Sequence, residues 1–220
     1  MIGKRIVVVC TANMIRSPFV AGLLASGWPT TAGGLTVESA GTAAREGRAA
    51  ADDVIRIGAA YGLGLEGHRT RRLDERILRA GDTVLCAERA HRRVVLDLRP
   101  DLLPSVFTVR EFGRLVESPS VRSAASTWPQ LVLAASRARL VERPVVVEDD
   151  DIVDPIGRAE HLWTEFERQA TEAVSAILGA VAPLLAQGTE SDVPGEPQAG
   201  GREMHHRPAS LTRPWGQGSS

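Results

Sequence analysis

A run of four β-branched residues near the start of the chain, Ile6-Val7-Val8-Val9, most constrains how it can fold. A continuous apolar run of this length is typical of a strand that is buried on both faces. Three further short runs predict strands, at residues 35–37, 83–87 and 106–109. Apolar residues at helical spacing alternate with these runs, at residues 17–24, 49–61, 90–98 and 159–186. This alternation predicts an α/β fold, with a mostly parallel sheet flanked by helices on both faces.

The regular pattern stops before the end of the sequence. Residues 187–220 are rich in Gly, Pro, Ser and Glu and lack apolar periodicity, so we expect a disordered C-terminal tail. Residues 1–186 fit one domain, since domains typically have roughly 100–200 residues. Within this domain the region 117–150 has no legible pattern, because several prolines interrupt it. Pro183 is expected to kink or end the last helix.

Composition excludes several classes of protein. The 26 basic and 27 acidic residues leave a net charge of -1, whereas a dedicated nucleic-acid binder is usually basic. Two cysteines, Cys10 and Cys86, are too few for a disulfide scaffold. The longest apolar stretch, residues 173–186, is shorter than the ~20 residues that a membrane span needs. We therefore expect a cytoplasmic protein that neither binds nucleic acid nor inserts into a membrane.

The segment that follows the first strand carries the chemistry. Cys10 ends the strand, Arg16 follows six positions later, and a helix is predicted from Ser17. A loop between a strand and a helix can point backbone N–H groups of residues 11–15 (Thr11, Ala12, Asn13, Met14 and Ile15) at an anion, and the helix N-terminus adds its positive end. The fork of Arg16 suits two phosphate oxygens. The same field favours a nucleophilic Cys10 thiolate, with Ser17 donating a hydrogen bond to it.

Asn13 suits a left-handed backbone position in the loop. Two points about this segment stay open on the residues alone. Cys10 could instead be an apolar residue at the end of a strand, since free cysteines are often buried. Phosphoryl transfer to a thiolate also needs an acid for the leaving oxygen, and Asp154, stiffened by Pro155, is the candidate. An ordinary Asp-Pro turn is the alternative, and residues 149–151 offer three rival aspartates.

These residues resemble the low-molecular-weight protein tyrosine phosphatases. That family has a Cys-x-x-Asn-x-x-Arg-Ser-Pro loop near its N-terminus and an Asp-Pro pair near its C-terminal helix, which match residues 10–18 and 154–155. The sequence Ser39-Ala40-Gly41-Thr42 and His68 match further signatures. The resemblance implies a four-stranded parallel sheet and no metal or organic cofactor. It also implies the roles of nucleophile for Cys10, phosphate binder for Arg16 and general acid for Asp154. Asn13, Ser17, Ser39 and His68 would support the loop.

The chain departs from the family at two places. Many relatives have a second cysteine beside the nucleophile, where this chain has Ile15, so we expect weaker redox protection of Cys10. Relatives that act on phosphotyrosine often have aromatic residues after the Asp-Pro pair and in the loop after residue 42. Here these positions hold Ile156-Gly157 and the segment 43–45 (Ala43-Ala44-Arg45). Phe19, His161 and Trp163 are further candidates for the mouth of the site.

Three functions are compatible with the sequence. The leading one is hydrolysis of phosphotyrosine in proteins through a phosphocysteine intermediate. The resemblance suggests a phosphorylated protein as partner, for example a tyrosine kinase of a surface-polysaccharide system. The second is an arsenate reductase on the same fold that uses an external thiol. The third is an inactive, regulatory phosphate-binding module.

Overall fold

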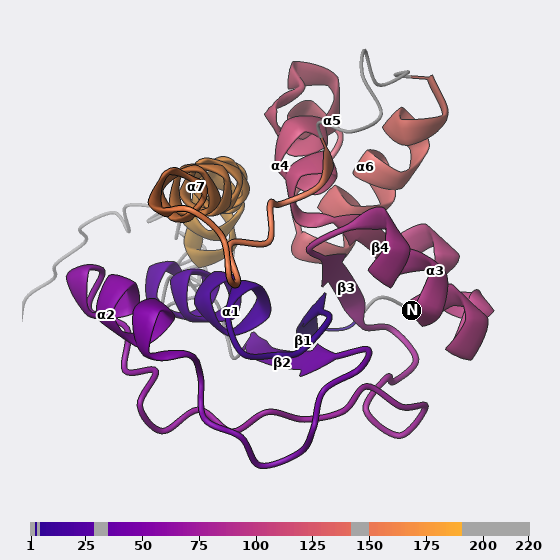
Figure 1. The fold of residues 1–220 in the computed structure, drawn as a ribbon. Coiled ribbons are helices and arrows are strands. Elements are labelled where there is room, and N and C mark those ends of the chain that lie inside the picture. The colour runs from indigo at the N-terminus through magenta and orange to yellow at the C-terminus, as the bar shows by residue number, and fades with distance from the viewer. Residues whose placement is uncertain (1–2, 4, 29–34, 142–149, 191–220) are drawn as a thin grey trace, which may run out of the picture.

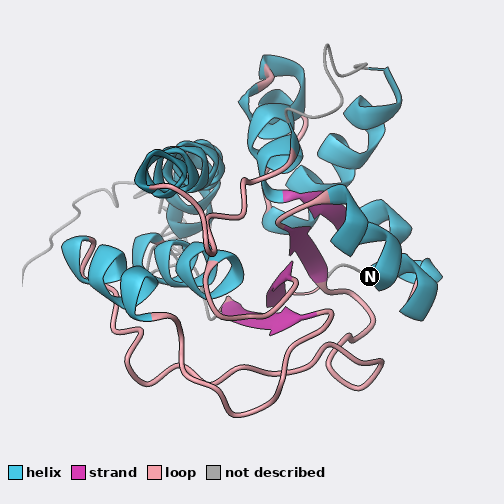
Figure 2. Cartoon of the chain, viewed as in Figure 1, coloured by secondary structure: helices cyan, strands magenta, loops and turns pink. Residues whose placement is uncertain are grey.

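The computed structural model describes residues 3, 5–28, 35–141 and 150–190. Four strands form one parallel sheet in the order β2-β1-β3-β4: β1 (Arg5–Cys10), β2 (Thr36–Gly41), β3 (Thr83–Cys86) and β4 (Val106–Thr108). Strand β1 is central, pairing Cys10 with Gly41 of β2 and Val9 with Cys86 of β3 (Figures 1 and 2). The expected four-stranded parallel α/β fold is therefore confirmed.

Helices cover both faces of this sheet. Their bounds are α1 (Arg16–Gly27), α2 (Asp52–Ala60), α3 (Arg89–Leu98), the 3-10 helix η1 (Pro100–Ser105), α4 (Val109–Glu117), α5 (Pro119–Ser123), α6 (Trp128–Val141) and α7 (Glu160–Glu190). Helices α1, α4, α6 and α7 share one hydrophobic core, and α3 with η1 belongs to a second core on the opposite face.

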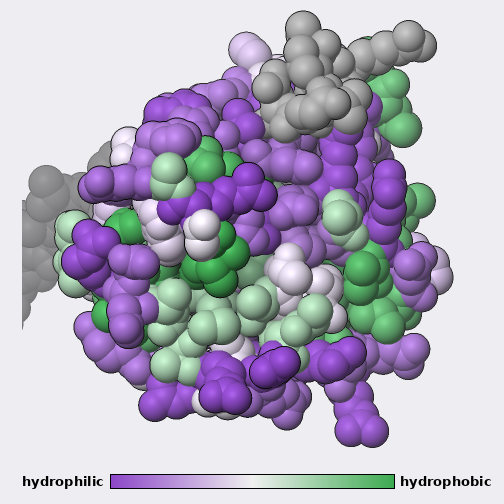
Figure 3. All heavy atoms as spheres, viewed as in Figure 1, coloured by the Kyte–Doolittle hydropathy of each residue, from purple (hydrophilic) through white to green (hydrophobic). Residues whose placement is uncertain are grey.

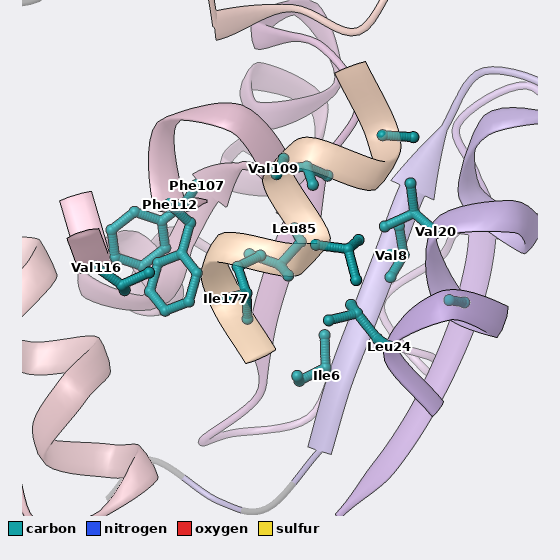
Figure 4. Packing of buried hydrophobic residues seen from close by; sticks show 14 of the residues in the cluster. Ile6, Val8, Val20, Leu24, Leu85, Phe107, Val109, Phe112, Val116 and Ile177 are labelled. Carbon is teal, nitrogen blue, oxygen red and sulfur yellow. The ribbon is translucent and has the colours of Figure 1, made fainter. Parts of the chain in front are cut away.

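The two cores follow from the alternation of side chains along β1. Ile6 and Val8 point into the larger core, and Val7 and Val9 into the smaller one, and all four are fully buried. Figure 4 shows Ile6 and Val8 beside residues of α1, with Ile177 of α7 across the cluster. Full burial of one such side chain stabilises the fold by about 1.5–3 kcal/mol. A run that looks uniformly apolar in the sequence therefore joins both halves of the molecule.

The region 117–150 contains helices that the sequence pattern did not predict. Pro119 is the first residue of α5, and Pro129 is the second residue of α6. A proline is tolerated in the first turn of a helix, where its missing N–H has no partner to lose. Both prolines therefore mark where helices start. Residues 142–149, with Pro144, lie outside the described residues.

Helix α7 corrects two expectations. It continues through Pro183 to Glu190, so the helix does not end at this proline, which was one of the two expected outcomes. Val181 and Leu184, on either side of this proline, are both buried. Their packing offsets the hydrogen bond that the proline removes. Residues 187–190 of the expected tail are thus helical, and residues 191–220 lie outside the described part. None of the described helices has the length and apolar character needed to cross a membrane.

Candidate active site

The candidate nucleophile lies at the carboxyl edge of the central strand. Cys10 ends β1, and the loop of residues 11–15 leads directly into α1 at Arg16. The Cys10 thiol is 3 % exposed. Its Sγ accepts a hydrogen bond from the backbone N–H of Asn13 at 3.2 Å and lies 3.0 Å from Ser17 Oγ. Both groups are placed to donate hydrogen bonds to this sulfur. We call residues 10–17 the Cys10 loop.

Asn13 holds the curvature of the Cys10 loop. It has φ of 57°, as expected for a left-handed position, and it is fully buried. Its Nδ2 donates to Ser17 Oγ and to Ser39 Oγ, both at 2.9 Å. Its Oδ1 accepts from the backbone N–H of Arg71 at 2.9 Å, and its carbonyl accepts from His68 Nε2 at 2.7 Å. The structure thus brings together all four residues that were expected to support the loop.

Close packing explains the glycine after Ser39-Ala40. A Cβ atom on Gly41 would lie 2.6 Å from the carbonyl oxygen of Thr11 and 2.8 Å from the backbone nitrogen of Asn13. The following N–H groups bind the loop, since Thr42 N donates to Cys10 O and Ala43 N to Thr11 O, each at 2.9 Å. The end of β2 therefore supports the Cys10 loop through backbone contacts that a larger residue would disrupt.

The remaining loop residues contribute mainly their backbone. The Ile15 side chain is buried in the larger core, and Met14 packs partly against it. The Met14 carbonyl accepts a hydrogen bond from Ala51 N at 3.0 Å. Within the described chain, the backbone N–H groups of Ala12, Met14 and Ile15 have no protein acceptor. These groups are available for an oxyanion, which is what a phosphate-binding loop requires.

Arg16 connects the Cys10 loop to the candidate acid. Its side chain is 2 % exposed, and its Nη2 donates to Asp154 Oδ2 at 2.7 Å and to Thr11 Oγ1 at 3.3 Å. Its Nη1 donates to Glu88 Oε1 and to the carbonyl of Ile152, the latter at 3.2 Å. Two carboxylates thus neutralise one buried guanidinium. The structure brings Arg16 and Asp154, which are far apart in the sequence, into direct contact.

Backbone and side-chain hydrogen bonds hold the segment that carries Asp154. We call residues 150–157 the acid segment. Ile152 N donates to the carbonyl of Ala87 at 2.8 Å, just beyond β3, and Val153 N donates to Gln169 Oε1 of α7 at 2.9 Å. The Asp154 carboxylate is itself 35 % exposed. It therefore lies between the buried Arg16 and solvent, where it can meet a leaving group.

The rival aspartates have other partners. Asp151 Oδ1 accepts a hydrogen bond from Arg89 N at 2.9 Å, and Asp150 pairs with the side chains of Arg89 and Arg114. Asp149 lies outside the described residues. Of the described aspartates, Asp154 is the one whose carboxylate contacts Arg16.

Two residues of the site, Glu88 and His91, were missed by the sequence analysis. Glu88 binds Arg16, and its backbone N–H donates to His91 Nδ1 at 3.1 Å. The proton of the neutral ring is therefore on Nε2, which donates to Thr11 Oγ1 at 2.8 Å. His91 is 3 % exposed, and burial lowers its pKa to about 4. The signal available was the spacing Glu88-x-x-His91 at the start of α3, where each side chain caps the other's backbone.

The mouth of the site contains few aromatic groups. Ile156, directly after Pro155, is 54 % exposed. Phe19, a candidate for the mouth, is instead fully buried and packs against Phe166 with 5.3 Å between ring centroids. His161 is exposed, and Trp163 lies half-buried against Phe166. Figure 3 shows residues of intermediate hydropathy at the centre of this face, with hydrophilic residues around them.

The described residues contain no group of three or more His, Cys, Asp or Glu side chains that could hold a metal ion. The second cysteine, Cys86, is fully buried in β3, and burial raises the pKa of its thiol well above the ordinary range. A buried thiol of this kind behaves as an apolar core residue.

Comparison with known proteins agrees with this geometry. The sequence pattern of the family described as low molecular weight phosphotyrosine protein phosphatase matches residues 5–119. The low molecular weight protein-tyrosine-phosphatase Wzb of Escherichia coli K12 is 33 % identical over 116 residues, which cover 53 % of this chain and 76 % of Wzb. The probable phosphatase EpsP of Ralstonia solanacearum is 32 % identical over 108 residues, covering 49 % of this chain and 72 % of EpsP.

Solved structures show the same fold. The YwlE arginine phosphatase from Geobacillus stearothermophilus superposes with a TM-score of 0.59 at 20 % identity, covering 92 % of this chain and 99 % of YwlE. The sequence match includes the whole Cys10 loop and its supporting residues on β2 and α3. The chain therefore belongs to the low molecular weight phosphotyrosine protein phosphatase family and is a cysteine-dependent phosphatase of that type.

Proposed function

We propose that this protein hydrolyses phosphotyrosine in proteins through a phosphocysteine intermediate. One observation carries the proposal: Arg16 joins the loop that donates hydrogen bonds to the Cys10 sulfur with the carboxyl group of Asp154. Nucleophile, oxyanion site and acid thus converge on one small volume. Family membership supports the same reaction class.

In the first step, the Cys10 thiolate attacks phosphorus, and the bond between phosphorus and the ester oxygen breaks. Phosphate oxygens accept hydrogen bonds from the unpaired N–H groups of the loop and from the guanidinium group of Arg16. The incoming oxygens compete with Asp154 for Arg16, so binding of the substrate releases this carboxyl group. The released carboxyl group takes up a proton from solvent. Asp154 donates that proton to the leaving phenolate oxygen.

In the second step, Asp154, now ionised, takes a proton from water, and the resulting hydroxide oxygen attacks phosphorus. The sulfur–phosphorus bond breaks and inorganic phosphate forms. The departing thiolate is stabilised by Asn13 N–H and by the hydroxyl group of Ser17. Neutral His91 directs its Nε2 proton at Thr11 Oγ1, which leaves the Thr11 hydroxyl proton free to point toward the substrate.

The substrate is proposed to be a phosphorylated protein, such as a tyrosine kinase of a surface-polysaccharide system. The tyrosine phosphatases among the relatives support this class of substrate. The mouth, with Ile156 in place of an aromatic residue, offers less contact to a phenyl ring. We therefore expect a strong dependence on the protein around the phosphotyrosine. The comparisons give no support to an arsenate reductase or to an inactive module.

The test is a panel of peptides that carry phosphotyrosine, phosphoserine or phosphoarginine, assayed with the wild-type protein and with Cys10→Ser. We expect release of phosphate from the phosphotyrosine peptides by the wild type alone. Acid quenching during turnover should trap phosphate on Cys10, detectable by mass spectrometry. Cys86→Ser is the matched control, because it also removes a thiol and should keep activity.

Three results would contradict the proposal. The first is turnover by Cys10→Ser at the wild-type rate. The second is preference for phosphoarginine or phosphoserine peptides over every phosphotyrosine peptide. The third is faster formation of arsenite from arsenate and glutathione than release of phosphate from any ester.

A further inference from the structure

A second cavity of about 420 Å³ lies between helices α3, α4 and α6, apart from the Cys10 loop. Figure 1 shows these three helices together on the side of the sheet that ends in β4. Five arginines line the cavity, three from α3 and one each from α4 and α6: Arg89, Arg92, Arg93, Arg114 and Arg139. We call this cavity the arginine pocket. Arg139 comes from beyond residues 5–119, so the pocket includes a part of the chain outside the family match.

The acidic residues that line the pocket do not balance this charge. Glu111 and Asp150 are its two carboxylates, and both residues are buried. Glu111 is shared between Arg139, at 2.8 Å, and Arg92, at 3.7 Å. Asp150 is shared by Arg89 and Arg114 in the same way, at 3.4 and 3.5 Å. Three of these four pairs are long for charge-assisted hydrogen bonds, and among the described lining residues five arginines face two carboxylates, an excess of three positive charges.

Arg139 shows the effect of this crowding. Its guanidinium lies 3.9 Å over the ring of Phe107, and burial lowers its pKa to about 10, with nearby Arg92 acting in the same direction. Its buried Nε has no well-aligned hydrogen-bond acceptor among the described residues, although Glu111 is near. An anion that enters the pocket would relieve the repulsion and supply acceptors for the guanidinium groups.

We propose that the arginine pocket is a second binding site, for a ligand that carries phosphate groups. Arginine suits such a ligand better than lysine because its planar fork can bind two oxygens of one phosphate. A concave site with an excess of positive charge also concentrates anions from solution. The site goes beyond the proposed hydrolysis, since its residues make no contact with Cys10 or Arg16 in the described structure.

The ligand chemistry has two possible sources, a small free phosphate compound or a second phosphorylated residue on the substrate protein. The pocket is close to the active site along the chain. Arg89 follows Glu88, which binds Arg16, and Asp150 begins the acid segment that ends near Asp154. A phosphoprotein bound at Cys10 could therefore extend toward this pocket.

The test measures binding at the pocket with the active site blocked. Alkylation of Cys10 with iodoacetate places a carboxylate in the Cys10 loop and excludes phosphate there. Isothermal titration then uses two probes, inorganic pyrophosphate and a peptide with two phosphotyrosines. We expect binding in the millimolar range or tighter, and about tenfold weaker binding by the double variant Arg92→Gln/Arg93→Gln, whose residues lie outside the acid segment. Arg56→Gln is the matched control, since Arg56 is exposed on α2.

The two probes distinguish the sources. Binding of pyrophosphate assigns a free small ligand, and binding of the peptide alone assigns a phosphoprotein. The proposal is overturned if neither probe binds below about 10 mM, or if the double variant binds both probes as tightly as Arg56→Gln does. Hydrolysis of an aryl phosphate by the unalkylated double variant should equal that of the wild type. The titration therefore tests binding at the arginine pocket independently of whether the protein hydrolyses phosphotyrosine.

Discussion

Replacing Asp154 by Asn separates two consequences of its contact with Arg16. The amide keeps the size of the side chain but can neither donate an acid proton nor carry a negative charge. If Asp154 protonates the leaving oxygen, the loss depends on how much that oxygen needs the proton. General acid–base catalysis typically contributes 10²–10⁴-fold, so we expect a loss of about 10²-fold or more for phenyl phosphate. For para-nitrophenyl phosphate, whose leaving group is a weak base, the loss should be much smaller.

The second consequence concerns the affinity for oxyanions. Asp154 Oδ2 lies 2.7 Å from Arg16 Nη2, a donor that the proposed phosphate would also use. Because the Asp154 side chain is 35 % exposed, solvent screens this pair. We therefore assign it about 1 kcal/mol, the upper range for exposed pairs. Removing the competition should tighten inhibition by inorganic phosphate about fivefold.

Steady-state kinetics with both esters, with inorganic phosphate as competitive inhibitor, measure both effects in one preparation. Asp53→Asn is the matched control, because that carboxylate is 55 % exposed on α2 and pairs with Arg56. Equal losses on both esters would refute Asp154 as the acid. Weaker inhibition by phosphate in Asp154→Asn would refute the competition for Arg16, even if the acid role held.

Four further substitutions test the supporting structure. Burial lowers the pKa of His91 from 6.5 to about 4, so as the pH is lowered the unfolded chain takes up the imidazole proton before the folded protein does. The free energy of unfolding should therefore decrease as the pH falls from 6.5 to about 4. In His91→Asn, urea titrations should show a smaller decrease in the free energy of unfolding over the same pH range. Gly41→Ala should lower the free energy of unfolding by about 1–3 kcal/mol, since its Cβ would meet Thr11 O at 2.6 Å; an unchanged urea midpoint would contradict this. Ile156→Tyr should raise kcat/KM for aryl phosphates several-fold, as stacking on a ring contributes about 1 kcal/mol, and no gain would mean that residue 156 does not face the substrate. Cys86→Ser should leave the peroxide sensitivity of the enzyme unchanged, because burial keeps this thiol protonated. The prediction is contradicted if a reducing thiol restores the activity of the peroxide-treated wild type but not that of Cys86→Ser.

The sequence predicted those parts of the site that are contiguous along the chain. The Cys10 loop is specified locally, because a buried strand, a left-handed Asn13 and the start of α1 follow one another within a few residues. The fold class was predictable for the same reason. Each strand is a short apolar run, and the spacing of apolar residues along the sequence distinguishes strands from helices.

The parts that were missed depend on contacts between distant elements. Residues 90–98 have the apolar spacing of a helix, but within it Ala90 and Val94 are exposed and the polar His91 is buried. The reason is that a hydrogen bond to Thr11 compensates the burial of a polar ring, which hydrophobic periodicity does not register. Helix α4 (Val109–Glu117) was also missed, and its Gly113 lies so close to α7 that a Cβ there would be 3.0 Å from the carbonyl oxygen of Ala173. Such close contacts are invisible in a single sequence.

The two carboxylates on Arg16 have different roles, and their positions explain why. Glu88 is the N-cap residue of α3, next to a regular helix, so we expect it to remain on Arg16 when phosphate binds. Asp154 belongs to a loop, and its carboxylate is reached by the backbone N–H of Ile156 at 3.2 Å. A phosphate that displaces Asp154 therefore leaves Arg16 with one carboxylate and one phosphate, the same number of anions as before. In the proposed mechanism, binding of the substrate would thus free the acid without leaving the charge of Arg16 unpaired, which would be costly in a side chain that is 2 % exposed.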